Sequence, residues 1–159
     1  MLKQEERSLR RELTKLKSIS NMEKKKIFVA YRVTGEDPEK LKAAIRKVCD
    51  SVSKSGCNYY STLLDEIENP KKFEGWEKGD YLKHALVELG KMDALLLFIN
   101  SENKSEGLLI EVGYALAKGK KIVLVIDRKV KDTYLREMVD KVIDYDNVDE
   151  VYAKIGKNL

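Results

Sequence analysis

The sequence predicts an α/β fold, a doubly wound five-stranded parallel sheet with a helical extension at its N-terminus. From Lys26 onward, short apolar β-prone runs alternate with longer segments whose apolar residues repeat at helical spacing. The 159 residues suit one domain with its own buried core. The longest apolar run, 94–99, is far shorter than the ~18 residues that cross a bilayer, so we expect a soluble cytoplasmic protein that does not bind membranes.

Residues 1–22 form the predicted helical extension, and residues 23–159 form the predicted domain. Large apolar residues in the extension follow one another at spacings of seven, four, three and three, which places them on one side of a helix. They are Leu2, Leu9, Leu13, Leu16 and Ile19. We expect this helix to dock on the domain or on a second copy of the chain.

The positive charge of the chain is concentrated in this extension. Residues 1–26 hold nine Lys and Arg against four Asp and Glu, a balance of +5, whereas the whole chain carries +4. The remainder therefore has 22 basic and 23 acidic residues, a balance of −1. A nucleic-acid partner is the weaker interpretation, because Glu5, Glu6 and Glu12 interrupt the basic residues of the extension.

The first half of the domain begins with a strand and a helix. The expected elements are a strand at 27–31, a helix at 39–54 and a second strand at 58–62. Pro38 suits the first position of the helix. The polar stretch 63–78 is broken by Pro70 and Gly75, and we expect it to be a long mobile loop.

The second half alternates regularly. The expected elements are helices at 80–91, 105–118 and 148–157, with strands at 94–100, 121–127 and 141–145. With right-handed crossovers, five such strands most often take the flavodoxin-like order 2-1-3-4-5. Ligands of these sheets bind where the winding reverses, at the carboxyl ends of strands 1 and 3. Two loops, 31–37 and 100–106, are thereby predicted to form the site.

Several common chemistries lack their motifs. The sequence contains neither a G-x-x-x-x-G-K-[ST] phosphate loop nor a G-x-G-x-x-G fingerprint. One histidine, His84, and two cysteines cannot supply the usual four-ligand zinc site. We therefore expect neither a metal nor a cofactor, and we expect His84 to be structural.

One acid stands among the apolar residues of the helix at 105–118. Glu111 has Gly107 and Ala115 four residues to either side, and these side chains are too small to bury it, so we expect the carboxylate to face a hollow. A buried acid is costly unless it is paired, hydrogen-bonded or neutralised. A salt bridge to a nearby lysine and a functional role both remain open on this pattern.

Three further residues in or near the two loops are candidates, each with a structural alternative. Asp93 precedes the third strand and could be a turn residue, and Ser105 suits the N-cap of the following helix. Arg32 is the one cation in the loop after the first strand, where an arginine suits a phosphate or carboxylate. A surface arginine without a ligand is equally common.

The run SEGLLIEVGYALAKGKKIVLVID closely resembles the motif of the nucleoside 2-deoxyribosyltransferases and the related 2′-deoxynucleoside 5′-monophosphate N-hydrolases. The matching positions are Gly107, Glu111, Gly113, Tyr114, Ala115, Gly119 and Lys120. The preceding KMDALLLFIN is similar to the strand entry of this family, with Asp93 at its aspartate, and IFVAYRVTGED is similar to its opening strand. The resemblance extends over residues 26–127.

This resemblance implies that Glu111 is the nucleophile and forms a covalent glycosyl-enzyme. The N-terminal half of its helix would favour the ionised carboxylate. Asp93 would assist departure of the base or hold the sugar. The implied substrate-binding residues are Tyr31, Arg32, Ser105, Gly107 and Tyr114.

Ser105 separates the two branches of the family. The transferases resembled here carry an aspartate six residues before the nucleophile, whereas the monophosphate hydrolases carry a serine that contacts the 5′-phosphate. We therefore expect an N-glycosidase that acts on a (deoxy)nucleoside 5′-monophosphate and assembles as a homo-oligomer. The alternatives are a base-exchanging nucleoside 2-deoxyribosyltransferase and a non-catalytic nucleotide-binding module of the flavodoxin or TIR type.

Overall fold

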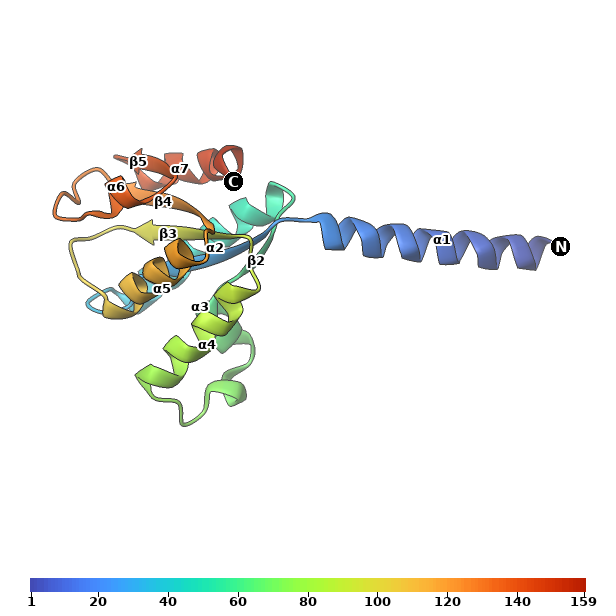
Figure 1. Cartoon of the computed structure of the whole chain (residues 1–159), viewed down its shortest axis with the longest axis horizontal. Coiled ribbons are helices and arrows are strands. Elements are labelled where there is room, and N and C mark those ends of the chain that lie inside the picture. Colours follow the sequence, from blue (N-terminus) through green and yellow to red (C-terminus); the bar gives the residue numbers. More distant parts are fainter.

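Five parallel strands form one sheet in the order β2-β1-β3-β4-β5, which confirms the predicted order (Figure 1). This computed structural model describes the side chains of residues 1–19 and 24–159, and only the backbone of residues 20–23. The strands are β1 (Lys26–Tyr31), β2 (Asn58–Tyr60), β3 (Ala94–Ile99), β4 (Lys121–Asp127) and β5 (Lys141–Tyr145).

Helices cover both faces of the sheet and divide the core into two layers. On one face, α2 (Pro38–Lys54) and α7 (Val148–Ile155) pack on β1, β3 and β4. The other face is covered by α4 (Lys78–Gly90), α5 (Glu106–Ala117) and the short α6 (Leu135–Met138). Of these three helices, α6 was not predicted from the sequence. The chain ends in the short 3-10 helix η2 (Gly156–Asn158).

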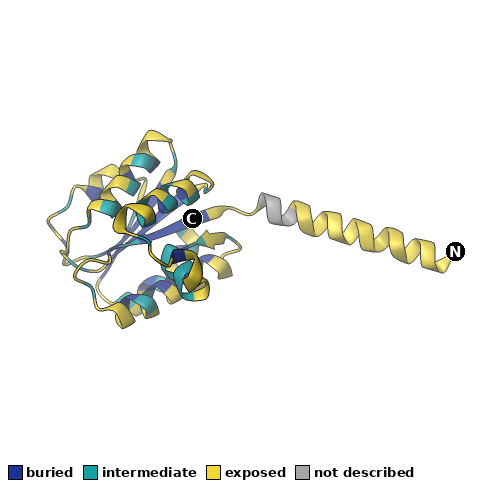
Figure 2. Ribbon diagram, turned by 90° about the horizontal axis from the view of Figure 1, so that it is seen from below, coloured by how far each residue is buried: buried dark blue, intermediate teal, exposed yellow. Residues whose placement is uncertain are grey.

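The central strands are apolar throughout because both of their faces are covered. Every residue of β3 is buried, as expected of a strand at the centre of a parallel sheet. Figure 2 shows the strands as the buried interior between exposed helix faces. Tyr31 at the end of β1 pairs with Phe98 of β3, so the loops that follow these two strands emerge side by side.

The stretch 63–78 is helical, and the expectation of a long loop was wrong. It contains most of α3 (Thr62–Glu68) and all of the 3-10 helix η1 (Pro70–Phe73). Ser61 caps α3 by accepting a hydrogen bond from the Leu64 amide. Phe73 is 3% exposed and packs against Trp76, so the segment has its own anchor in the fold.

The N-terminal helix α1 (Leu2–Glu23) forms as predicted but does not dock on the domain. It projects away from the sheet (Figure 1), and every residue from 1 to 19 is exposed. Docking on its own domain, one of the two expected roles, is therefore not what the structure shows. No helix among the described residues is both long and apolar enough to span a bilayer.

Candidate active site

The two loops predicted at the switch point are joined by side-chain hydrogen bonds. Arg32 Nη1, after β1, donates to the backbone oxygen of Ser101, after β3. Glu36 accepts hydrogen bonds from the Ser101 hydroxyl and, at 3.1 Å, from Asn103 Nδ2. Gly35 has φ +77°, and a Cβ there would lie 2.8 Å from Asn103 Nδ2, so glycine permits this close approach. The carboxyl edge between β1 and β3 is thus a connected structure.

Arg32 connects the two loops from a buried position. Its side chain is buried, at 4% exposure, and Nε has no hydrogen-bond partner among the described residues. Burial lowers the pKa of the guanidinium, and the acids Glu102 and Glu36 partly counteract this effect. Arg32 is therefore not a free surface cation, and its buried Nε is a donor without a partner among the described residues.

The N-terminus of α5 lies beside this loop. Ser105 is its N-cap, as predicted, because its Oγ accepts a hydrogen bond of 3.3 Å from the Leu108 amide. The Ser105 hydroxyl hydrogen is not used in this contact and can be donated to a ligand. Leu108, Val112 and Ala115 fix the helix by packing into the core.

Glu111 is in the second turn of α5, and its side chain is half-buried without a compensating polar partner among the described residues. Burial raises the pKa of Glu111 to about 7, and desolvation is the only cause of the shift. In the part of the chain that the structure describes, no salt bridge or hydrogen bond reaches the carboxylate. The lysine salt bridge, one of the two alternatives left open by the sequence, is therefore absent there, and burial outweighs the expected effect of the helix N-terminus.

Gly107 and Tyr114 lie on the side of α5 that faces α4. A Cβ at Gly107 would lie 4.0 Å from Leu82 of α4, an ordinary contact distance, so the two helices are neighbours at their N-terminal ends. The Tyr114 hydroxyl lies 2.9 Å from the position of a Cβ at Gly90, the last residue of α4. Gly107 is thus close to the switch point, whereas the Tyr114 hydroxyl lies toward the opposite edge of the sheet.

Asp93 also lies at that opposite edge. Its Oδ2 accepts a hydrogen bond of 2.8 Å from the Lys26 amide at the start of β1, and its own amide donates to the Lys26 carbonyl. These bonds place Asp93 at the amino ends of the strands, away from the loops that emerge at the carboxyl ends. The structure does not bring Asp93 and Glu111 together, in contrast to the shared site that the resemblance implied.

Tyr31 ends β1 at the carboxyl edge and is a second ionisable group withdrawn from water. Burial raises the pKa of Tyr31, hydrogen bonds with Leu63 and Ser61 oppose this, and the negative charges of Glu111 and Glu66 add to it. Tyr31 is therefore within electrostatic range of Glu111. Among the predicted residues, the structure gathers Tyr31, Arg32, Ser105, Gly107 and Glu111 around this edge.

A hydrogen-bonded group at the end of β2 was not predicted from the sequence. The Tyr60 hydroxyl lies 2.6 Å from Asp65 Oδ2 and 2.7 Å from His84 Nε2. Burial opposes ionisation of Asp65, but hydrogen bonds from Lys72, Tyr60 and Asn69 outweigh it and lower the pKa. The sequence gives one signal for this group: Tyr60 and Asp65 lie five residues apart, at and just after the end of β2. His84 lies on α4, so its contact with Tyr60 joins α4 to the end of β2, which agrees with the structural role predicted for His84.

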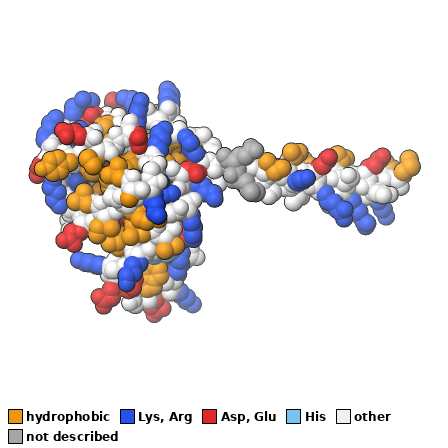
Figure 3. Space-filling view, viewed as in Figure 1, with side chains coloured by type: hydrophobic (Ala, Val, Ile, Leu, Met, Phe, Trp, Pro, Cys, Tyr) orange, Lys and Arg blue, Asp and Glu red, His pale blue; other side chains and the backbone are white. Residues whose placement is uncertain are grey.

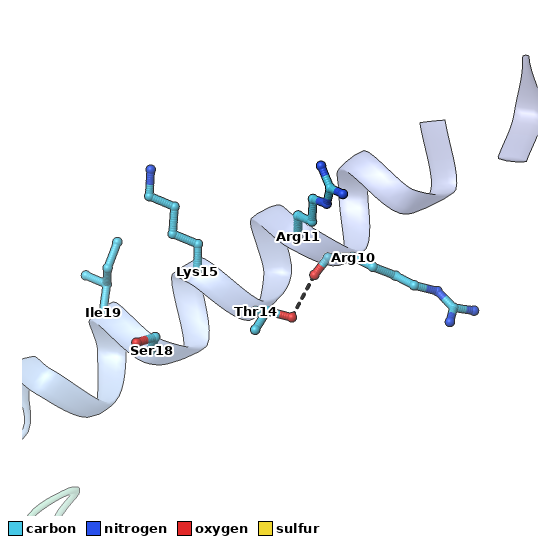
Figure 4. Close-up of a pocket in the computed structure, with 6 residues that line it drawn as sticks. All are labelled: Arg10, Arg11, Thr14, Lys15, Ser18 and Ile19. Carbon is cyan, nitrogen blue, oxygen red and sulfur yellow. Dashed lines mark hydrogen bonds between the residues drawn. The ribbon is translucent and has the colours of Figure 1, made fainter. Parts of the chain in front are cut away.

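Neither a metal site nor the hollow on α1 adds to the site around Glu111. Across residues 1–19 and 24–159, no three His, Cys, Asp or Glu side chains are placed to share a metal ion. A hollow lies on α1 and is lined only by that helix (Figure 4). It is far along the chain from the switch point, and no second element closes it.

Known structures share this fold. The CMP N-glycosidase BcmB of Clostridium botulinum superposes with a TM-score of 0.62 at 21% identity, covering 85% of this chain and 100% of its own. A 2-deoxyribosyltransferase from Bacillus psychrosaccharolyticus gives 0.58 at 18% identity, covering 80% and 90%. The rubredoxin oxygen:oxidoreductase of Desulfovibrio gigas gives 0.53 at 14% identity, covering 87% of this chain and 37% of its own. No family model and no curated protein matches the sequence.

These likenesses establish the doubly wound fold. They include proteins with different chemistries, since an oxidoreductase stands beside a glycosidase and a transferase. Fold alone does not assign a reaction. The reaction must therefore be inferred from the side chains at the switch point.

Proposed function

We propose that this protein is an N-glycosidase that cleaves the bond between base and sugar in a (deoxy)nucleoside 5′-monophosphate, with Glu111 as the nucleophile. The observation that carries the proposal is the Glu111 carboxylate, half-buried without an ion-pair partner among the described residues and with its pKa raised to about 7. Structural acids are normally paired when they are buried. An unpaired one beside a ligand-binding edge is typical of a catalytic group.

The reaction needs a carboxylate that can form and release a glycosyl ester. One Oε atom of Glu111 attacks C1′ of the sugar, the C1′–N bond breaks, and its electron pair leaves with the base, which takes up a proton. Water then attacks C1′ and displaces Glu111, which yields the sugar 5′-phosphate, a proton and the free carboxylate. Both steps pass through positively charged, oxocarbenium-like transition states that the Glu111 charge stabilises.

The substrate phosphate would bind where α5 begins. The first amides of α5, the free hydroxyl hydrogen of Ser105 and the positive charge of Arg32 all favour an anion at this end of the helix. Charge is supplied locally, because residues 27–159 carry a net charge of about −1 by the residue counts. Tyr31 and Gly107 border the same edge and are proposed to contact the nucleoside.

Product analysis on purified protein tests this proposal. CMP is the first substrate to try, since a CMP N-glycosidase shares the fold, followed by the other ribo- and deoxyribonucleoside monophosphates and the matching nucleosides. We expect base release from a monophosphate, loss of activity in Glu111→Gln, and a mass increase of one sugar phosphate on Glu111 after acid quenching. Glu39→Gln is the matched control, because Glu39 is an exposed acid on α2.

Unchanged base release by Glu111→Gln would refute the role of Glu111. Binding of monophosphates without any product would instead favour the nucleotide-binding module. The two results are separated by calorimetry and chromatography on the same samples.

A transferase is the second candidate, supported by the shared fold with a 2-deoxyribosyltransferase. In that case a free base replaces water in the second step and attacks the same glycosyl ester. Adding adenine or cytosine to a deoxynucleoside donor would then produce an exchanged nucleoside. Release of free sugar in place of the exchanged product would reject the transferase.

A further inference from the structure

The exposed side of α1 carries apolar residues that the domain does not cover. Figure 3 shows hydrophobic side chains along one side of this helix, with Lys and Arg gathered along the other. The large apolar residues are 41–79% exposed, and they are Leu2, Leu9, Leu13, Leu16 and Ile19. Isolated helices of about this length are marginal in water unless an apolar face is packed, so this face calls for a partner.

The spacing of the four leucines fits a heptad repeat, and Ile19 falls at a g position beside it. Leu2, Leu9 and Leu16 occupy successive d positions, and Leu13 occupies the a position between the last two. Glu6 occupies the preceding a position, where a polar residue lowers stability but restricts register. The face is therefore built for another helix aligned along its length.

The charges beside the leucines specify which helix. In this frame the e positions hold Lys3, Arg10 and Lys17, and the g positions hold Glu5, Glu12 and the apolar Ile19. The two signs lie on opposite flanks of the leucine stripe. In a parallel pair of identical helices each g residue meets the e residue five positions later on the other copy.

That rule gives each of the two acidic g residues a basic partner. Glu5 meets Arg10 of the second copy, and Glu12 meets Lys17 of the second copy. An antiparallel pair would place g beside g and e beside e, which brings acids against acids and bases against bases. The charge pattern thus favours the parallel arrangement and disfavours the antiparallel one.

We propose that α1 pairs with α1 of a second copy of this chain as a parallel two-stranded coiled coil. The hollow of Figure 4 extends from the outer side of α1, at Arg11, Thr14, Lys15 and Ser18, to the flanks of the seam, at Arg10 and Ile19. Its outer part faces away from the seam in this arrangement, and its flanks border the second copy. The proposal goes beyond the proposed reaction and does not depend on it.

A charge exchange tests the pairing in the full-length chain. One variant carries Glu5→Lys and Glu12→Lys, and the other carries Lys3→Glu, Arg10→Glu and Lys17→Glu. Each variant alone has like charges on both flanks, so we expect each to lose self-association in light scattering. Mixing differently tagged variants should restore pairing, with at least a tenfold preference for the mixed over either self-pair in pull-down.

Equal capture of mixed and self-pairs would overturn the proposal, as would a wild-type chain that stays monomeric at micromolar concentration. Because the substituted residues are all exposed on α1, the domain remains folded in both variants. Any association made by the domain itself contributes equally to every pair and does not create the preference.

A cysteine pair tests the orientation. Glu6→Cys places a thiol at an a position, which faces its own copy only in the parallel pair, and we expect a disulfide-linked dimer to form at least fivefold faster than with the control. Ser8→Cys is the matched control, at an outward c position two residues away. The parent chain supplies the background from Cys49, which is buried, and Cys57. Equal crosslinking of the two variants would refute the parallel register.

Discussion

Glu111 and Asp93 are both acids flanked by apolar sequence, and the structure places them at opposite edges of the same sheet. At the amino edge, Asp93 exchanges two hydrogen bonds with the backbone of Lys26. Asp140 does the same with Ile122 two strand pairs further on, where its Oδ2 accepts from the amide at 2.8 Å and its amide donates to the carbonyl. Glu111, near the carboxyl edge, has no such partner among the described residues.

The difference shows how to separate a structural acid from a functional one in this fold. An aspartate just before a parallel strand can pair with the exposed backbone of the neighbouring strand, and the repetition at Asp93 and Asp140 identifies this as an edge cap. A carboxylate that is desolvated and unpaired has no stabilising function. Its retention in a helix beside the switch point therefore requires a chemical explanation.

The largest expected effect comes from exchanging the two acids for their amides in separate variants. Glu111→Gln should lower base release by at least ~10³-fold, because a nucleophile is removed, whereas Asp93→Asn should stay within about threefold of the parent. Steady-state assays at saturating monophosphate measure both. Comparable losses in the two variants would show that the amino edge also takes part in the reaction.

The pH dependence sharpens the role of Glu111. A nucleophile must be ionised, so with a pKa near 7 we expect kcat/KM to rise as pH increases and level off above about 7, falling about tenfold per unit below it. A general acid would give the opposite slope. The profile should be measured from pH 5 to 9 at low substrate concentration, with a nucleoside as well as a monophosphate to separate titration of the phosphate.

Stability should respond in the opposite direction to activity. The raised pKa means that the folded state holds its proton more tightly than the unfolded state, so stability falls as pH increases from about 4.5 to 7. Glu111→Gln removes this cost and should raise the free energy of unfolding by up to about 3 kcal/mol at pH 8, with little change at pH 4. Urea unfolding of the parent and variant at both pH values measures it. A destabilised variant at pH 8 would mean that the carboxylate has a stabilising partner.

The smallest effect is expected at the amino edge. Asp93→Ala removes one acceptor from the Lys26 amide and should lower the free energy of unfolding by about 1 kcal/mol, since this hydrogen bond is exposed. Asp140→Ala removes the acceptor of a part-buried hydrogen bond from the Ile122 amide and should cost somewhat more. Thermal unfolding measures both, and a loss several times larger at Asp93 alone would separate the two positions.

The sheet and its switch point could be predicted because apolar strand runs and helical periodicity are local signals. Ser105 as an N-cap and Glu111 as an unusual buried acid followed from the same local patterns. The sheet order follows from general rules of chain connection rather than from any single residue. The loop after β1 was correctly located, but the backbone hydrogen bond of Arg32 to Ser101 depends on two segments far apart in the chain.

The errors arose where tertiary contacts decide the outcome. The stretch after β2 looked like a loop because Pro70 and Gly75 interrupt it, yet Pro70 begins a 3-10 helix and Phe73 anchors it. Asp93 was assigned by its position in a motif, and only the strand pairing shows that its carboxylate serves Lys26. Tyr114 shares the motif of Glu111, but it lies two-thirds of the way along α5, beside the end of α4.

The aromatic cluster around Phe73, in the stretch 63–78, also provides an optical signal. Trp76 is the one tryptophan of the chain, and its ring centroid lies 4.7 Å from that of Phe73, 5.5 Å from Tyr81 and 5.2 Å from His84. Its fluorescence therefore reports on a single region, the connection between β2 and α4. Movement of this connection during substrate binding would be visible in the same emission without any attached dye.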